Sequence, residues 1–113
     1  MLKLPLLKAI CEAPGVSGFE RRIRELVIRE VTDLSDEVQV DNSGNVMAIR
    51  RGKNPKRVMV GAHMDEIGFI VNYIDDKGFL RFLPLGGFDP KTLTAQRVIV
   101  HGRKDVLGVL GCK

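Results

Sequence analysis

The sequence contains few of the residues that form disulfides and thiolate metal sites. Only two cysteines occur among 113 residues, Cys11 and Cys112, and they stand far apart and outside any CxxC pattern. A disulfide or a cysteine-bound metal is therefore not expected, whereas two reduced thiols are typical of a cytosolic protein. On this ground we predict a cytoplasmic location.

Aromatic residues, basic clusters and long apolar runs are also scarce. Tryptophan is absent, aromatic residues make up 5%, and the Lys and Arg residues behind the net charge of +4 are scattered among acids. Surfaces that bind nucleic acid need clustered basic residues, so we expect no nucleic-acid partner. No apolar stretch approaches the roughly 20 residues of a membrane span, and the start of the chain lacks a signal-peptide pattern. We expect no membrane partner.

The first third of the sequence has helical periodicity. Apolar residues spaced four apart predict a helix over residues 3–12, which ends before a Pro-Gly pair. A second apolar face predicts a helix over residues 18–32. Ser17 and Glu20 have the spacing of a capping box, which predicts that this helix begins at Ser17.

The rest of the sequence is rich in strand and turn patterns. Three hairpins are predicted, in which residues 37–41 pair with 46–51, 67–74 with 79–83, and 97–101 with 106–110. A single helical turn is predicted at residues 91–93, before the third hairpin. The chain therefore changes from helix-rich to strand-rich near residues 67–74. It stops directly after an apolar run, from which we expect a fragment whose exposed apolar surface favours self-association.

One stretch combines a buried-strand pattern with residues that bind metals. The apolar residues 58–62 predict a strand covered on both faces, and His63 and Asp65 follow where it should end. Ligand sites in open α/β sheets lie beyond the carboxyl ends of strands. A histidine there can offer a ring nitrogen to a metal, and an acid can hold its other ring N–H. A hydrogen-bonded structural histidine is the alternative.

Three motifs in order resemble one family. GAHMDEIGF (residues 61–69), preceded by APGVSGFE (13–20) and DNSGNV (41–46), is similar to the amino-terminal part of the M42 metallopeptidases. This family includes glutamyl and deblocking aminopeptidases, and some of its members carry endoglucanase names. The resemblance covers essentially the whole chain.

The resemblance implies an α/β fold class with two parts. Residues 1–70 would open a zinc-peptidase-like catalytic α/β domain, and residues 71–113 would begin an inserted, β-barrel-like domain for dimerisation. Complete members bind two divalent metal ions, zinc or cobalt, cleave N-terminal residues from peptides, and form homo-oligomers in which dimers build a dodecamer. His63 matches a metal ligand and Asp65 the catalytic acid that orients it.

The other residues of such a site have no counterpart in this sequence. The family's bridging Asp, its Glu pair, its further acid ligand and its distal His lie beyond the inserted domain. His101 falls in the second part and is interpreted as a structural or surface residue. With at most a partial site and no general base, we predict that the 113-residue chain alone is inactive.

Two other functions are compatible with parts of the pattern. A non-catalytic module that uses its β-rich half for oligomerisation or binding is the first alternative. An endoglucanase is the second and less favoured one, because sugar-bond hydrolysis needs two paired carboxylates. The acids of this sequence show no such pairing, and a His-x-Asp at a strand end suits a metal better.

Overall fold

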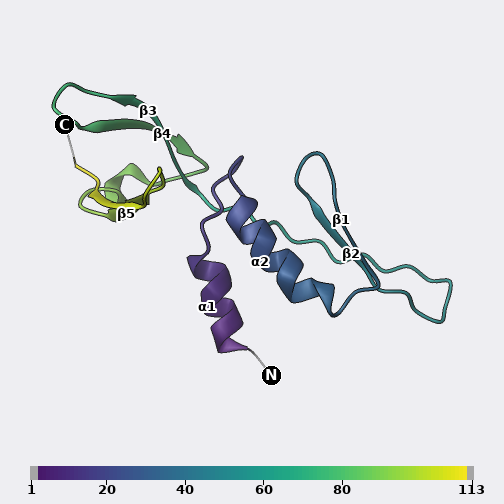
Figure 1. Cartoon of the computed structure of the whole chain (residues 1–113). Coiled ribbons are helices and arrows are strands. Elements are labelled where there is room, and N and C mark those ends of the chain that lie inside the picture. The colour runs from purple at the N-terminus through teal and green to yellow at the C-terminus, as the bar shows by residue number, and fades with distance from the viewer. Residues whose placement is uncertain (1–2, 112–113) are drawn as a thin grey trace. The chain divides into compact units, whose positions relative to one another are not determined.

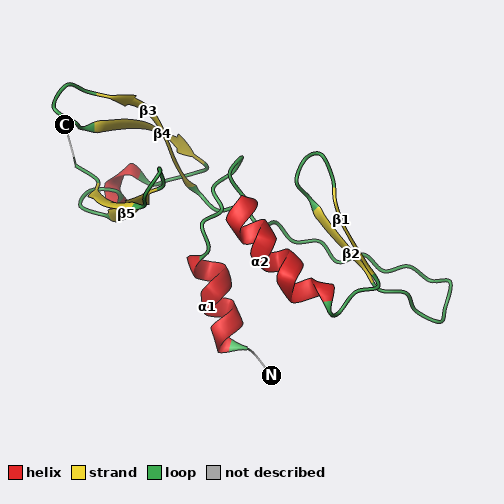
Figure 2. Ribbon diagram, in the orientation of Figure 1, coloured by secondary structure: helices red, strands yellow, loops and turns green. Residues whose placement is uncertain are grey.

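A computed structural model describes residues 3–111, which divide into two compact units, Met1–Phe69 and Ile70–Lys113. The first unit contains two helices and a hairpin, and the second is built from short strands (Figures 1 and 2). The elements in chain order are α1 (Leu4–Glu12), α2 (Arg21–Thr32), β1 (Glu37–Val40), β2 (Val46–Ile49), β3 (Gly68–Ile74), β4 (Leu80–Leu85), the 3-10 turn η1 (Pro90–Thr92), β5 (Arg97–Val100) and β6 (Val106–Val109). The boundary between the units falls within β3.

Helix α1 confirms the prediction for residues 3–12. Its proline lies in the first turn, where the missing N–H has no helical partner to lose. The helix ends at Ala13, whose extended backbone precedes Pro14. None of its residues is buried; Leu4, Leu7 and Ile10 are 67%, 45% and 43% exposed, and Leu6 is half-buried. The apolar stripe of α1 is therefore uncovered in the part of the chain that is described.

Helix α2 begins later than the capping-box pattern predicted. Glu20, not Ser17, occupies the N-cap position, and Arg24 N–H makes a helical bond to the carbonyl of Glu20 (2.8 Å). The prediction fails because Gly18 has a φ of +86°, which helical backbone cannot adopt. The Glu20 carboxylate accepts the N–H of Gly18 instead, and so closes the turn ahead of the helix.

The β1–β2 hairpin packs against α2 (Figure 1). Its strands are antiparallel, with Glu37 opposite Ile49 and Val40 opposite Val46. Among the described residues of α2, only Ile23 is buried, with 3% of its surface exposed. Burial of such a side chain contributes about 1.5–3 kcal/mol, so Ile23 is the apolar centre of the described part of the first unit.

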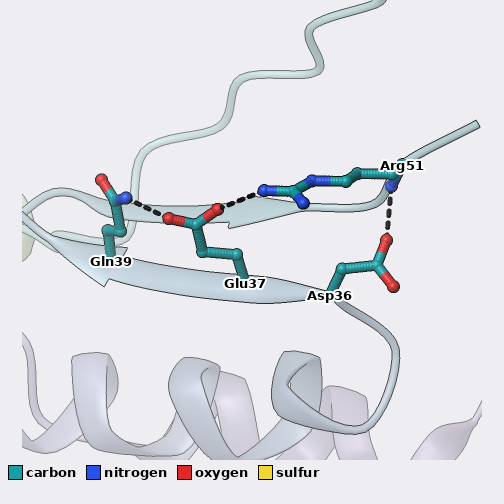
Figure 3. Close-up of polar contacts among 4 residues, drawn as sticks. All are labelled: Asp36, Glu37, Gln39 and Arg51. Carbon is teal, nitrogen blue, oxygen red and sulfur yellow. Dashed lines mark hydrogen bonds and ion pairs between the residues drawn. The ribbon is translucent and has the colours of Figure 1, made fainter.

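Polar side chains fasten the open end of the same hairpin (Figure 3). The Asp36 carboxylate accepts the backbone N–H of Arg51, and the Arg51 guanidinium reaches the Glu37 carboxylate at 3.1 Å. Gln39 donates to the same Glu37 side chain. These groups are exposed, and exposed pairs of this kind contribute well under about 1 kcal/mol each.

The predicted strand at residues 58–62 is wrong for this structure. The backbone there forms no strand (Figure 2), and Val58, Met59 and Val60 are 89%, 94% and 91% exposed. A strand covered on both faces needs neighbours that take its N–H and C=O groups. No strand pairs with this segment among residues 3–111.

The second unit contains two further hairpins, as predicted. β3 pairs with β4, and β5 pairs antiparallel with β6, with Ile99 opposite Leu107. The turn before β4 is closed by Asp75, whose carboxylate accepts the N–H groups of Lys77 and Phe79 (3.1 and 2.8 Å). Leu110 extends the β5–β6 pairing through two backbone bonds and is 8% exposed.

The described residues thus form a small α/β arrangement with short, two-stranded sheets. The predicted helical turn at 91–93 is realised as the 3-10 turn η1, which Asp89 caps by accepting from the N–H of Lys91. Among the described residues, no helix is long and apolar enough to cross a membrane.

Candidate metal-ligand site

His63 and Asp65 contact each other directly. The Nδ1 atom of His63 lies 2.9 Å from Oδ1 of Asp65 and 3.0 Å from the backbone carbonyl oxygen of Asp65. Because both partners are hydrogen-bond acceptors, Nδ1 must be the donor of the ring. The lone pair of His63 is therefore on Nε2, and the side chain that carries it is 86% exposed. This is the tautomer in which an imidazole can bind a metal through Nε2.

The donor chemistry of this pair fits one ligand of a divalent metal site. A neutral imidazole suits zinc and similar ions, and a carboxylate on its other nitrogen is the usual orienting partner. Protein metal sites of this kind use three or more protein ligands. Within residues 3–111, no three side chains of the metal-binding types gather at one place. Within the described residues, the donor chemistry of the pair therefore fits a single ligand position with an orienting acid, and no complete metal site.

Glu66 ties the end of this segment to the loop that follows α1. Its backbone N–H donates to the carbonyl of Gly15 (2.8 Å), and its Oε1 accepts the N–H of Gly15 (3.0 Å). Val16 and Glu66 form an isolated parallel bridge at the same point. Sequence analysis assigned no role to Glu66 beyond its place in the motif, because its partner lies 51 residues away in the chain.

Two glycines allow this close approach. A Cβ on Gly15 would lie 2.6 Å from Cγ2 of Ile23, and a Cβ on Gly68 would collide with the side chain of Val16. Both Cβ atoms would lie closer to these neighbours than ordinary van der Waals contact allows. A side chain at Gly15 would therefore push the loop away from Ile23, and one at Gly68 would push β3 away from Val16. A glycine after a proline was the signal for Gly15, although the sequence alone was equally consistent with a simple turn.

The DNSGNV motif forms a turn in which both carboxylate oxygens of Asp41 accept hydrogen bonds from the turn itself. Asp41 Oδ1 accepts the N–H groups of Ser43 and Asn45 at 2.9 Å, and Oδ2 accepts the side-chain amide of Asn45 at 2.8 Å. The side-chain amide of Asn45, followed by its backbone N–H, lowers the pKa of Asp41 below its ordinary value of 3.8. These bonds favour the ionised carboxylate and give Asp41 a structural task.

The remaining candidates are His101 and the two cysteines. The Nδ1 atom of His101 is 3.0 Å from Oδ1 of Asp105 within the second unit, which agrees with a structural histidine. Cys11 carries an exposed free thiol. Cys112 lies outside the described residues.

Known proteins match this chain along its length. The profile of the M42 glutamyl aminopeptidase family matches residues 44–113. A lysyl aminopeptidase of Pyrococcus furiosus is 49% identical over 113 residues, which cover 98% of this chain and 32% of that protein. The chain belongs to the M42 family. It spans about a third of the length of the relatives that it matches, and the family depends on divalent metal ions in general.

Solved structures share this fold. A TET aminopeptidase from a marine sediment Thaumarchaeota archaeon has a TM-score of 0.92 at 38% identity, with 97% of this chain and 31% of that one covered. The Pyrococcus horikoshii TET1 peptidase, described as assembling into a tetrahedron or a large octahedral shell, has a TM-score of 0.84 at 39% identity (97% and 33%). A Thermotoga maritima protein named endoglucanase has a TM-score of 0.87 at 37% identity (95% and 34%).

Proposed function

We propose that this chain is the amino-terminal part of a metal-dependent aminopeptidase that removes residues from the N-terminus of peptides. The observation that carries the proposal is the contact between His63 Nδ1 and the Asp65 carboxylate, which leaves Nε2 exposed for a metal. Membership of the M42 family supplies the class of reaction. The proposed ions are two divalent cations, zinc or cobalt.

The roles of the two residues follow from their chemistry. His63 offers Nε2 as a ligand, and Asp65 holds the ring in the required tautomer through the bond to Nδ1. Bound divalent ions would supply Lewis acidity and an activated water. Residues 3–111 gather no further metal ligands around this pair, so we propose that the 113-residue chain alone does not turn over peptides.

The two compact units support a division of labour. We assign residues 1–70 to the catalytic α/β domain and residues 71–113 to an inserted oligomerisation domain. The exposed apolar side chains of the short sheets, among them Ile99 and Leu107, are 56% and 79% exposed and favour association with other copies. The assemblies described for the Pyrococcus horikoshii relative support a homo-oligomer of the whole protein. A cytoplasmic location remains part of this proposal.

The first test is an assay of the chain with aminoacyl chromogenic substrates in the presence of zinc or cobalt. We expect no turnover above that of the metal salt alone, because one imidazole cannot hold a catalytic metal centre. Robust turnover by the purified chain would contradict this expectation and would require a site other than the one described.

The second test uses the protein expressed from the complete reading frame that carries this chain. His63→Ala should lower metal content and reduce kcat/KM by orders of magnitude, and Asp65→Asn should lower metal affinity about 10- to 100-fold. His101→Ala is the matched control, because it removes a histidine bonded to an Asp in the other unit. Equal effects of the His63 and His101 variants would remove the basis of the proposal.

The endoglucanase alternative finds no support in the described acids. Glycoside hydrolysis needs two carboxyl groups about 5–9.5 Å apart that flank the sugar bond. The Asp65 carboxylate is bonded to His63, and the Glu66 carboxylate is bonded to Gly15, so each has a different partner. We therefore do not propose this activity.

A further inference from the structure

We propose that Glu66 is a positioning residue that fixes the tautomer and orientation of His63 through its bonds to Gly15. The role of His63 as a metal ligand rests on the proposed function, whereas the test of Glu66 does not depend on it. Both bonds between Glu66 and Gly15 lie within the first unit, and they join the residue directly after Asp65 to the loop that ends α1.

The link from Glu66 to His63 passes through a single peptide group. The carbonyl of Asp65 accepts from His63 Nδ1 (3.0 Å), and the N–H of the same peptide, which belongs to Glu66, donates to Gly15 (2.8 Å). A trans peptide is planar, so its C=O and N–H point in opposite directions and move together. Holding the N–H at Gly15 therefore sets the direction in which the carbonyl faces the imidazole.

The Glu66 side chain makes this hold a two-point contact. With the backbone bond alone, the Asp65–Glu66 peptide could pivot about one hydrogen bond. The second bond, from Gly15 N–H to Oε1 of Glu66 at 3.0 Å, joins Glu66 to the same residue of the loop after α1. Gly15 is buried and lies against Ile23, the most enclosed side chain of the unit, so the anchor is a rigid one.

The residues that precede His63 are exposed and offer it little packing among the described residues. Val58, Met59 and Val60 are about nine-tenths exposed, and the imidazole itself is 86% exposed. The direction of the ring therefore depends on Asp65 and on the peptide that follows it. Loss of the Glu66 carboxylate should leave this peptide to pivot about its remaining backbone bond to Gly15, without disturbing α2 or the β1–β2 hairpin.

The test is the ring tautomer of His63, read by long-range proton–nitrogen NMR of the metal-free full chain at pH 8, where imidazoles are generally neutral. We expect the Nδ1–H form to dominate. Glu66→Ala should raise the ratio of Nε2–H to Nδ1–H about fivefold, because the loosened peptide no longer holds the Asp65 carbonyl at Nδ1 and the loss of one such hydrogen bond has about that effect. Glu66→Gln keeps an acceptor oxygen for Gly15 and should stay within about twofold of the wild type.

Two controls separate positioning from folding. Glu25→Ala removes an exposed carboxylate of α2 that pairs with Arg21, and it should leave the His63 ratio unchanged. If Glu66→Ala loses the amide protection of β1 and β2, Glu66→Asp replaces it, because the shorter acid cannot reach Gly15. The Asp variant should then shift the ratio and the Gln variant should not.

An unchanged ratio in Glu66→Ala, or an equal response of the Gln variant and the Ala or Asp variant, overturns the proposal. The readout needs neither metal nor substrate. If the tautomer ratio changes in the Glu66 variants but the complete protein has no metal-dependent activity, the proposed function is rejected and the positioning role stands. If the complete protein is an active metalloenzyme and the tautomer ratio does not change in the Glu66 variants, the positioning role is rejected and the proposed function stands.

Discussion

The hairpin of residues 36–51 and the segment of residues 58–62 are both rich in β-forming residues, yet only the first is paired. In the hairpin, β1 and β2 are joined by a five-residue turn, so each strand meets its partner a few residues away. Residues 58–62 have no partner strand within residues 3–111 and are exposed. A strand whose partner follows after a short turn therefore forms from local sequence. An apolar run with equally strong β-forming residues stays unpaired when its partner strand is not nearby in the chain.

Hydrogen exchange should give the largest contrast between the two regions. Amides of β1 and β2 are held by the ladder, by the Asp41 turn and by the contact with α2, so they should exchange at least about tenfold more slowly than their intrinsic rates. Amides of residues 58–62 should exchange close to their intrinsic rates. Mass spectrometry or NMR on the intact chain measures both in one experiment. Strong protection of residues 58–62 in the monomer would contradict the exposed segment.

Replacing Gly44 should weaken the hairpin specifically. Its φ of +86° costs a residue with a side chain about 1–2 kcal/mol, and a Cβ there would meet the Arg24 guanidinium. Gly44→Ala should lower the opening free energy of β1 and β2 amides by that amount. Gly52→Ala is the matched control, because a Cβ at Gly52 meets open space and should change the value by less than about 0.5 kcal/mol. Equal effects would show that the turn geometry does not limit the hairpin.

Acid should produce the smallest of these effects on the hairpin. The folded turn lowers the pKa of Asp41, so its contribution to stability is complete above the ordinary carboxyl pKa of about 3.9 and is lost as pH falls through the lowered value. NMR shifts of the Asn45 backbone and side-chain amides between pH 7 and 2 should stay constant to about pH 5 and then move. Asp41→Asn should remove this transition, whereas a transition that persists in Asp41→Asn would contradict its assignment to Asp41.

The same division between local and distant partners explains what the sequence could predict. The helices, the three hairpins and the turn at η1 were predicted, because each is specified by residues a few positions apart. The start of α2 was wrong because the Ser17–Glu20 spacing outweighed Gly18, whose positive φ ends the turn before the helix. Gly18, the residue that decides where α2 starts, was present in the sequence, but the sequence did not give its backbone conformation.

The candidate site shows the limit more sharply. The spacing of His63 and Asp65 was sufficient to predict their contact, since the partners are only two positions apart in the chain. The bonds between Glu66 and Gly15 connect positions 51 residues apart, and no periodicity or motif spacing encodes that distance. The strand at 58–62 was wrong for the same reason, because burial on two faces is a property of neighbours and not of the run itself.

The exposure of Met59 gives the chain an internal chemical reporter. Thioether oxidation follows access of the oxidant to sulfur, and Met59 is 94% exposed whereas Met64, five residues on, is partly covered. Mild peroxide should therefore convert Met59 to its sulfoxide before Met64. Any surface that later covers residues 58–62, whether another part of a longer protein or a second copy, will slow that conversion, so the rate of one reaction records whether the segment has found its neighbour.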